Sequence, residues 1–412
     1  MYFLYNLIVI CASTILKVLA LVNSKLSLFV NGRKETISLI KKSVSIDDNV
    51  IWIHAASLGE YEQGLPVLEK IKIDYPSYKI VLTFFSPSGY EVKKNSKIAD
   101  VICYLPMDTK SKVNSFLTAA HPDIAIFIKY EIWPNYLSAL KKSSIPTFLI
   151  SVLFKENQIY FKWYGAFMRR SLNKFSHFFV QNEKSKTLLN SVGHTNVTIA
   201  GDTRFDRVNE IVERNNELDF MTRFKDGKFC LVAGSTWPED EKLIIEYINK
   251  TTYPIKFVIA PHTIKDNHIQ EIIQSLDKKV VRFTTLENSD VEDSEVLIID
   301  TIGLLTKIYS YADMAYVGGG FSTGLHNTLE PAVFGIPVII GPKYHGFAEV
   351  EELVDLKGVI SIENTNEFTE VTNNCFTNDD FRVKTGHINT GYIKNKSGAT
   401  DRIMTVLNSV IG

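Results

Sequence analysis

The sequence predicts an α/β protein with two doubly wound, Rossmann-like domains behind an N-terminal membrane-anchoring helix. Three observations support this prediction: a length of 412 residues, short apolar runs that alternate with amphipathic stretches, and an uncharged apolar beginning. A chain of this length is too long for one ordinary domain. Hydrophobic residues make up 45% of it and charged residues 22%, which are the proportions of a globular protein.

Charge and composition exclude several classes of protein. Lysine and arginine together number 45 against 46 aspartates and glutamates, so the chain has no overall basic field of the kind that attracts nucleic acid. The four cysteines form no CxxC pair, and the histidines form no H-x-x-x-H pair. We therefore expect no nucleic-acid partner, no disulfide framework and no metal site.

The first 22 residues are predicted to form the anchoring helix. No charged residue precedes Lys17, and apolar residues resume after it as far as Val22. A spanning helix needs about 20 mostly apolar residues, and a lysine near its end can reach the interface. A cleaved signal peptide is disfavoured, because no basic residue comes before the apolar stretch and no clean cleavage site follows it. A helix that lies along the membrane surface or packs on the domain remains an alternative.

Basic residues after this helix set its expected orientation. By the positive-inside rule, they place the rest of the chain in the cytoplasm. The same side chains are suited to attract lipid phosphates, although a solvated basic face that only sets topology explains them equally well. The residues are Lys25, Arg33, Lys34, Lys41 and Lys42, and the last four are the candidates for lipid contact.

Ten short apolar runs predict the strands of two sheets. They are rich in valine, isoleucine and phenylalanine and apolar on both faces, which is typical of buried parallel strands. The first series is 50–54, 79–84, 123–128, 146–151 and 177–181, and the second is 229–234, 256–260, 296–300, 314–318 and 336–341. Helical patterns such as 64–75 and 326–335 lie between the runs. Two series of this size indicate two domains.

The break between the domains is predicted near residues 201–220, where the sequence turns polar. This gives an anchor over 1–22, an N-terminal domain over 23–200 and a C-terminal domain over 201–412. Two such domains that face each other form a cleft between the carboxyl ends of their strands, where open α/β sheets bind ligands. Functional side chains are therefore expected just after strands.

Three junctions between a predicted strand and a helix carry a polar residue followed three positions later by glutamate. This is the spacing of a capping box, which by itself does no more than begin a helix. Neighbouring glycines favour a functional interpretation, because they let a ligand approach the backbone, and the free N–H groups of a helix start bind phosphate or carboxylate. The pairs are Ser57 and Glu60, Thr236 and Glu239, and Asn327 and Glu330.

The glycine-rich run 318–324 matches neither common nucleotide motif. Its last glycine comes one residue late for G-x-G-x-x-G, and the run lies late in the chain, so a dinucleotide oxidoreductase is a weak hypothesis. The sequence contains no G-x-x-x-x-G-K-[ST], which excludes P-loop chemistry. We therefore expect no cofactor.

Three charged residues are candidates for chemistry. Glu60 lies at a helix start beside the expected cleft, where a carboxylate can act as a general base toward an attacking hydroxyl. Glu131 directly follows a predicted strand, although a solvated loop acid is an equal alternative. Arg204, near the domain break, is placed to meet an anionic substrate, unless it only pairs with Asp202 or Asp206.

Several segments together resemble the 3-deoxy-D-manno-oct-2-ulosonic acid (Kdo) transferases of lipopolysaccharide assembly. They are WIHAASLGE (52–60), EIWPN (131–135), GDTRFD (201–206), AGSTWPEDE (233–241), DTIGLL (300–305) and residues 318–353. Their joint order and spacing is specific, and the likeness covers most of the chain. The resemblance implies a glycosyltransferase-B fold, which agrees with the two facing domains.

The resemblance also implies the reaction. Such enzymes move Kdo from CMP-Kdo to a lipid A precursor, invert the anomeric configuration, and need no metal in the active site. The expected partners are CMP-Kdo, a precursor like lipid IVA and the membrane, with the N-terminal domain binding the acceptor at the cytoplasmic face of the inner membrane and the C-terminal domain binding the donor. The alternative is another glycosyltransferase-B enzyme or an epimerase that uses a UDP-sugar. A membrane-tethered scaffold that binds a sugar nucleotide is the non-enzymatic alternative.

Site residues follow from the resemblance position by position. Glu60 corresponds to the general base, Glu131 lies in the segment that helps to stabilise the transition state, and Arg204 stands where lysine is usual. The expected donor contacts are Pro261, His262, Ile302, Gly303, Leu304, Asn327, Thr328, Leu329 and Glu330. The chain departs from the family pattern at His262, where a phosphate-binding arginine is common, and at Thr328, where proline is common. It also has Lys129 where an acid is common.

Overall fold

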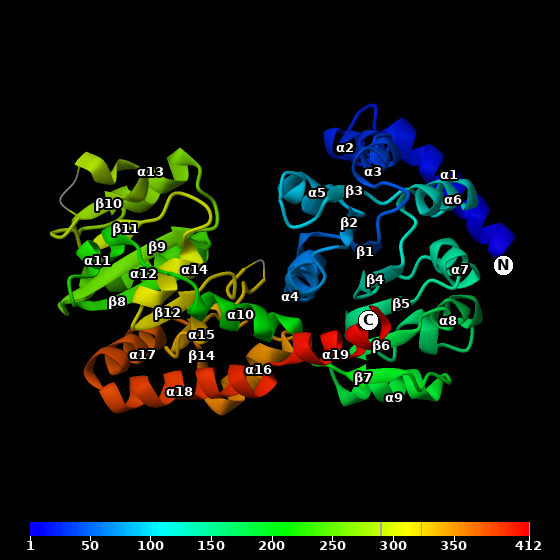
Figure 1. The fold of residues 1–412 in the computed structure, drawn as a ribbon. Helices are drawn as coiled ribbons and strands as arrows, with labels where there is room; N and C mark the ends of the chain where they lie inside the picture. The colour runs from blue at the N-terminus through cyan, green and yellow to red at the C-terminus, as the bar shows by residue number, and fades with distance from the viewer. Residues whose placement is uncertain (289–290, 323, 412) are drawn as a thin grey trace. The chain divides into compact units, whose positions relative to one another are not determined.

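The computed structural model describes residues 1–288, 291–322 and 324–411 (Figure 1). The chain divides into two compact units: unit 1 comprises Met1–Arg207 with Ser397–Gly412, and unit 2 comprises Val208–Lys396. Within the described residues, each unit contains one seven-stranded sheet with helices along the connections between its strands. The predicted fold class of two Rossmann-like α/β domains is therefore confirmed. Thr323, in the glycine-rich run, lies outside the described residues.

The sheet of unit 1 has the strand order β3-β2-β1-β4-β5-β6-β7, and all neighbours are parallel. The strands are β1 (Val50–Ala55), β2 (Lys79–Phe84), β3 (Val101–Tyr104), β4 (Ile124–Ile128), β5 (Thr147–Val152), β6 (His177–Val180) and β7 (Val197–Ile199). Because parallel strands all end at the same edge, the loops that follow them gather there.

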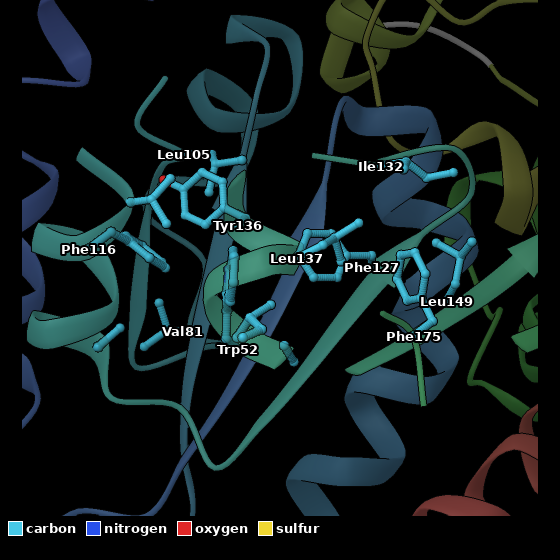
Figure 2. Packing of buried hydrophobic residues seen from close by; sticks show 14 of the residues in the cluster. Trp52, Val81, Leu105, Phe116, Phe127, Ile132, Tyr136, Leu137, Leu149 and Phe175 are labelled. Atoms are coloured by element: carbon cyan, nitrogen blue, oxygen red, sulfur yellow. The ribbon is translucent and has the colours of Figure 1, made fainter. Parts of the chain in front are cut away.

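Helices and two apolar clusters cover this sheet. The helices are α1 (Tyr2–Leu19), α2 (Ser24–Gly32), α3 (Thr36–Ser43), α4 (Leu58–Asp74), α5 (Pro87–Lys93), α6 (Lys110–Ala120), α7 (Pro134–Lys142), α8 (Ala166–Leu172), α9 (Glu183–Ser191), α19 (Ala399–Ile411) and the 3₁₀ turn η1 (Ile159–Phe161), with α10 (Thr203–Glu213) crossing into unit 2. Trp52 packs among Phe116, Phe127 and Tyr136 (Figure 2). Ile53, the next residue, belongs to the other cluster, because side chains alternate across a strand.

The sheet of unit 2 has the strand order β10-β11-β9-β8-β12-β13-β14, again with parallel neighbours. Its strands are β8 (Phe229–Thr236), β9 (Ile255–Pro261), β10 (Val280–Arg282), β11 (Val296–Ile298), β12 (Met314–Val317), β13 (Val338–Ile340) and β14 (Val359–Ser361). Its helices are α11 (Asp219–Lys225), α12 (Pro238–Lys250), α13 (Asp266–Gln274), α14 (Leu305–Ile308), α15 (Leu329–Ala332), α16 (Ala348–Leu356), α17 (Thr365–Thr377) and α18 (Asp379–Lys396), with 3₁₀ turns η2 (Phe283–Asn288) and η3 (Tyr309–Tyr311).

All ten predicted apolar runs form strands, and four further strands went unpredicted. These four are β3, β7, β10 and β14, which are the edges of the two sheets. Strands β7, β10 and β14 have three residues each, one of them polar, so they leave no apolar run. Strand β3 is apolar throughout, and its run was missed. Of the two helical patterns named from the sequence, 64–75 lies mostly in α4, whereas only Leu329–Ala332 of 326–335 is helical.

The C-terminal segment packs with unit 1, although the domain bounds drawn from the sequence place it in the second domain. Ile403, Met404 and Leu407 of α19 are buried in the same cluster as residues of α4. Asp206 accepts hydrogen bonds from the backbone N–H groups of Gly398 and Thr400 at the start of α19. The division of labour between an acceptor domain and a donor domain remains a prediction.

Among the described residues, α1 alone is long and apolar enough to cross a membrane by length and composition. Its mean hydropathy is 1.8 and 6% of it is buried. A signal sequence near the N-terminus satisfies the same criterion, so the anchor over 1–22 remains a prediction as well.

A buried carboxylate organises the start of α12 and the glycine-rich loop after β12. Asp240 is fully buried and accepts hydrogen bonds from Trp237 N–H at 2.9 Å, Gly319 N–H at 2.8 Å and the Tyr316 hydroxyl at 2.6 Å. The capping pair is therefore Trp237 and Asp240, one residue later than the predicted Thr236 and Glu239. Asp240 rather than Glu239 is the capping carboxylate, because it also accepts hydrogen bonds from β12 and from the loop after it. Sequence spacing does not show these two donors.

We expect Asp240→Ala to lower the free energy of unfolding of unit 2 by about 3–5 kcal/mol, because three buried donors lose their acceptor. Hydrogen exchange of unit 2 peptides across a urea series measures this loss. Glu239→Ala changes an exposed acid on the same helical turn and is expected to leave stability nearly unchanged. Equal stability of the two variants would contradict the structural role assigned to Asp240.

Candidate active site

The three predicted catalytic residues all follow strands at the carboxyl edge of the unit 1 sheet. Glu60 follows β1, Glu131 follows β4 and Arg204 follows β7. β1 and β4 are neighbours in the sheet. The structure therefore places Glu60 and Glu131 on adjacent loops.

Glu60 lies in the first turn of α4, where the helix dipole favours a carboxylate. Ser57 is the N-cap residue, as predicted, but its hydroxyl makes no bond to the helix backbone and donates instead to the Glu60 carboxylate. One turn later, a Cβ at Gly64 would meet Ile128 Cδ1 at 2.1 Å, so glycine lets α4 lie close against β4. The helix start and the close packing together position Glu60.

Two nitrogen atoms hold one oxygen of Glu131. Its Oε2 lies 3.0 Å from His54 Nε2 and accepts a hydrogen bond from Trp133 Nε1 at 2.9 Å. The side chain is 16% exposed. Within the part of the chain that the structure describes, Oε1 has no hydrogen-bond partner, so this oxygen is available to a ligand.

His54 belongs to a buried chain of polar groups that sequence analysis did not select. It is fully buried, and its Nδ1 lies 2.9 Å from Thr83 Oγ1 and 3.1 Å from the Thr83 carbonyl oxygen. Thr83 Oγ1 also accepts a hydrogen bond from Trp52 Nε1 at 2.8 Å. These hydrogen bonds fix the His54 imidazole that contacts Glu131. The only sequence signal was a histidine inside an otherwise apolar strand.

Arg204 pairs with Asp202, which was the simpler of the two sequence interpretations. Its Nε and Nη2 donate to Asp202 Oδ2 at 2.9 and 2.8 Å, and its backbone N–H donates to Oδ1. The Thr203 hydroxyl donates to the Gln63 carbonyl oxygen of α4 and lies 3.1 Å from Ser151 Oγ of β5. Thr203, which follows the edge strand β7, therefore contacts α4, the helix that carries Glu60.

Left-handed backbone occurs without glycine at three strand ends. Lys129 after β4, Ser151 in β5 and Ser235 in β8 have φ values of 60°, 57° and 54°. Residues other than glycine rarely adopt this backbone conformation, and backbone strain of this kind is concentrated at functional sites. Lys129 directly precedes the Glu131 loop, and Ser235 precedes Trp237, so both candidate regions sit on constrained turns.

In unit 2, three aromatic rings gather at the carboxyl ends of β8, β9 and β12. His262, directly after Pro261 at the end of β9, stacks on Trp237 with ring centroids 4.4 Å apart and an angle of 18°. His326 lies 4.9 Å from His262 and accepts a hydrogen bond from Trp237 Nε1 at 3.2 Å. A stacked, partly exposed platform of this kind is suited to a nucleotide base. Trp237 and His326 were not among the predicted site residues.

Two further groups of predicted donor contacts follow β11 and β12. Asn327 and Glu330 form the predicted pair: Asn327 Nδ2 donates to Glu330 Oε1, and Asn327 Oδ1 accepts from the Leu329 N–H, both at 3.1 Å. The buried Thr328 hydroxyl has no partner among the described residues.

The segment 302–304 follows β11. Ile302 is 86% exposed, Gly303 has a φ of 98°, and Leu304 precedes α14. The start of α14 packs over the end of β8, because a Cβ on Gly234 would meet Leu305 Cδ2 at 2.9 Å. Across residues 1–288, 291–322 and 324–411, no group of three or more His, Cys, Asp or Glu side chains is arranged to hold a metal ion.

In comparisons with known proteins, the chain is similar to 3-deoxy-D-manno-octulosonic acid transferases. Residues 31–207 match the family described as 3-deoxy-D-manno-octulosonic-acid transferase (kdotransferase). The 3-deoxy-D-manno-octulosonic acid transferase of Haemophilus influenzae is 25% identical over 420 residues, covering 98% of this chain and 97% of that protein. The Aquifex aeolicus protein of the same name is 27% identical over 339 residues, covering 81% and 87%.

Solved structures confirm the glycosyltransferase-B fold. The UDP-GlcNAc 2-epimerase of Neisseria meningitidis has a TM-score of 0.60 at 16% identity and covers 88% of this chain and 100% of that one. At this identity the likeness concerns the fold alone.

We expect Thr83→Val to destabilise unit 1 by about 2–3 kcal/mol, because Trp52 Nε1 and His54 Nδ1 lose the hydroxyl while the side-chain volume is kept. Thr83→Ser keeps the hydroxyl and loses one methyl, so it is expected to cost about 1 kcal/mol. Urea unfolding of both variants provides the comparison. A larger loss in the serine variant would show that packing, rather than the polar chain, dominates.

We also expect unit 2 to lose stability on acidification. Burial and the nearby His262 lower the pKa of His326 from 6.5, so the folded state binds fewer protons than the unfolded chain. The contribution of neutral His326 to the free energy of unfolding is complete above about pH 6.5 and falls as the pH decreases below that value. Protonation also removes the lone pair that accepts from Trp237.

Urea midpoints of unit 2 at pH 7.5 and 5.5 measure this effect. In His326→Gln, an amide oxygen replaces the acceptor without titrating, so the difference between the two pH values is expected to shrink. An unchanged difference would assign the pH dependence to other groups.

Proposed function

We propose that this chain, which is similar to the Kdo transferases along nearly its whole length, transfers Kdo from CMP-Kdo to a lipid A precursor resembling lipid IVA. The reaction belongs to the assembly of the lipopolysaccharide core. It inverts the anomeric configuration and uses no metal ion in the active site. The observation that carries the proposal is the placement of Glu60 and Glu131 on adjacent loops at one sheet edge, in a chain with this relationship.

Glu60 acts as the general base. An acceptor hydroxyl loses its proton to the Glu60 carboxylate as its oxygen forms a bond to the anomeric carbon of Kdo. The bond between that carbon and the CMP phosphate oxygen breaks at the same time, and CMP leaves with the electron pair. Attack from the face opposite the leaving group inverts the configuration. The contact from Ser57 to Glu60 supports this role, because it fixes the carboxylate at the helix start.

Glu131 and Arg204 stabilise charge in the transition state. The anomeric centre becomes electron-poor as CMP departs, and the unpartnered Oε1 of Glu131 is the group suited to face it. Arg204 offsets the negative charge that grows on the phosphate, in the place where lysine is usual in the family. Its bonds to Asp202 hold the guanidinium in position for this task.

Unit 2 binds the donor. Pro261 and His262, the segment 302–304, and the four residues from Asn327 to Glu330 contact the CMP moiety. The stacked rings of Trp237 and His262 support this assignment, since an aromatic face receives a nucleotide base. The Thr328 hydroxyl, buried without a partner in the described chain, supplies a hydrogen bond.

Unit 1 binds the acceptor at the cytoplasmic face of the inner membrane. The acyl chains of a lipid A precursor keep it in the bilayer, so the enzyme must work at that surface. The apolar helix α1 supports this location, because it provides the attachment that such an acceptor requires.

The test is transfer from CMP-Kdo to a tetraacylated lipid A precursor, with products counted by mass spectrometry. Glu60→Gln is expected to lower kcat by about 10²- to 10⁴-fold, because the proton acceptor is lost. Glu62→Gln removes a carboxylate from the same helix whose one ion pair among the described residues is with Lys93, so it is expected to keep full turnover. Wild-type turnover is expected to persist in EDTA.

Product from both variants at equal rates would remove Glu60 from its role and keep the reaction. Reconstituted wild-type protein that binds UDP, does not bind CMP and forms no product would instead identify a UDP-sugar enzyme of the same fold.

A further inference from the structure

One stripe of α1 is partly covered along the helix, although none of its residues is fully buried. The partly buried residues recur at the spacing of a single helical face. They are Tyr2, Tyr5, Asn6, Val9, Ala12, Ser13 and Leu16. A helix that projects away from its domain is not covered on one side, so α1 lies along the surface of unit 1, beside α6 in Figure 1.

Polar contacts fasten this stripe to the body of unit 1. Tyr5 donates its hydroxyl hydrogen to Asp108 Oδ2 at 2.7 Å, and Asn135 Nδ2 donates to Asn6 Oδ1 at 3.0 Å. Asp108 also accepts from the backbone N–H groups of Asn135 and Tyr136, which begin α7. A lone helix that crossed a bilayer would lose these contacts, and its polar side chains would face lipid.

The outward face of α1 is almost entirely apolar and has no protein partner within the described residues. Phe3 is 82% exposed and Val18 is 61% exposed, and the residues between them continue the same surface. The remaining exposed apolar residues of this face are Leu4, Leu7, Ile8, Ile10, Ile15 and Leu19. A contiguous apolar surface of this extent marks a site of membrane or protein contact.

Lysines border this face at a pocket between α1 and the start of α6. The pocket has a volume of about 510 Å³, and its lining contains Lys17, Lys110 and Lys112 but no acidic residue. Among the described residues, none of the three pairs with a carboxylate. Burial and the like charges of Lys17 and Arg33 lower the pKa of Lys112, as happens where cations gather without an anion. Apolar residues such as Phe3 and Ile10 line the same pocket.

Arg33, which the sequence marked as a possible contact for lipid phosphate, is committed elsewhere. Its guanidinium donates to the carbonyl oxygens of Leu105, Phe29 and Phe85. It also lies over the rings of Phe29 and Phe85. Arg33 therefore fastens α2 to the sheet and is not available to an anion.

We propose that unit 1 rests on an anionic bilayer with α1 in the plane of the interface, and that a lipid phosphate group binds among Lys17, Lys110 and Lys112. The apolar face enters the acyl region while the lysines meet the headgroups, as in monotopic proteins. Like charges at the border disfavour a second copy of the chain as the occupant. The inference deepens the membrane attachment in the proposed function and rests on it.

Co-sedimentation with vesicles tests the phosphate site. Lys110→Gln/Lys112→Gln is expected to weaken binding about tenfold or more to phosphatidylcholine vesicles that contain phosphatidylglycerol, with little change on phosphatidylcholine alone. The matched control is Lys41→Gln/Lys42→Gln, exposed lysines at the end of α3 that the sequence marked as candidates for lipid contact. His121, at the opposite end of α6 from the pocket, contacts Ser45 close to that pair. The structure therefore separates this pair from the proposed phosphate site, and the control is expected to bind as the wild type does.

Cys11 reports the orientation of α1. It is the exposed cysteine in the middle of the helix, whereas Cys103, Cys230 and Cys375 are buried and have pKa values raised to about 12. A nitroxide attached to it in the full chain is expected about 5–10 Å below the headgroups. A label at the bilayer centre, about 15 Å deep, would show that the helix spans.

Each other outcome overturns the proposal. Equal weakening in both lysine pairs would indicate general charge attraction, and no weakening in either would remove the site. Inorganic phosphate that binds the wild type but not Lys110→Gln/Lys112→Gln, without any effect on vesicles, would indicate a soluble anion. A vesicle-free dimer that dissociates on Leu7→Ser would indicate a second copy. Because binding needs no catalysis, Glu60→Gln must bind vesicles normally even where the proposed reaction fails.

Discussion

Each sheet in this protein is parallel and buried on both faces, so every segment that leaves it turns at the same edge with backbone donors still to be satisfied. Polar side chains must therefore concentrate there, whatever the protein does. In unit 2 this requirement is met by Asp240, one carboxylate serving a helix start, a strand and a glycine loop. In unit 1 it is met by Asp108, which follows β3 and accepts from the backbone N–H groups of Asn135 and Tyr136 at the start of α7.

The need to satisfy backbone donors at the sheet edge also shapes the candidate sites. A loop whose backbone is already satisfied by buried partners can hold a side chain still without using that side chain's own hydrogen bonds. Glu131 illustrates this: His54 and Trp133 occupy one oxygen and leave the other open. The strained turn at Lys129 is tolerated because β4 on one side and the buried His54 contact on the other fix its position.

Much of the fold could be predicted from the sequence, because central parallel strands are apolar on both faces and therefore appear as runs of apolar residues. Three of the edge strands were not, since β7, β10 and β14 have three residues each and one of the three is polar. Within the candidate site, spacing after strands singled out Glu60 and Glu131 but not the groups that hold them. His54 and Thr83 meet only because β1 and β2 pair in the register that sets them opposite each other. Asp240 lies 76 and 79 residues from its partners Tyr316 and Gly319, a distance that no local motif spans.

The return of α19 to unit 1 has a consequence for the order of folding during synthesis. Ile403, Met404 and Leu407 complete a core cluster whose other members were made some two hundred or more residues earlier. The Arg402 guanidinium closes the same junction on the Ala200 carbonyl oxygen. Unit 2 is thus an insertion that a ribosome finishes before it finishes unit 1. The N-terminal portion emerges first, and its core cluster remains incomplete until α19 has been made.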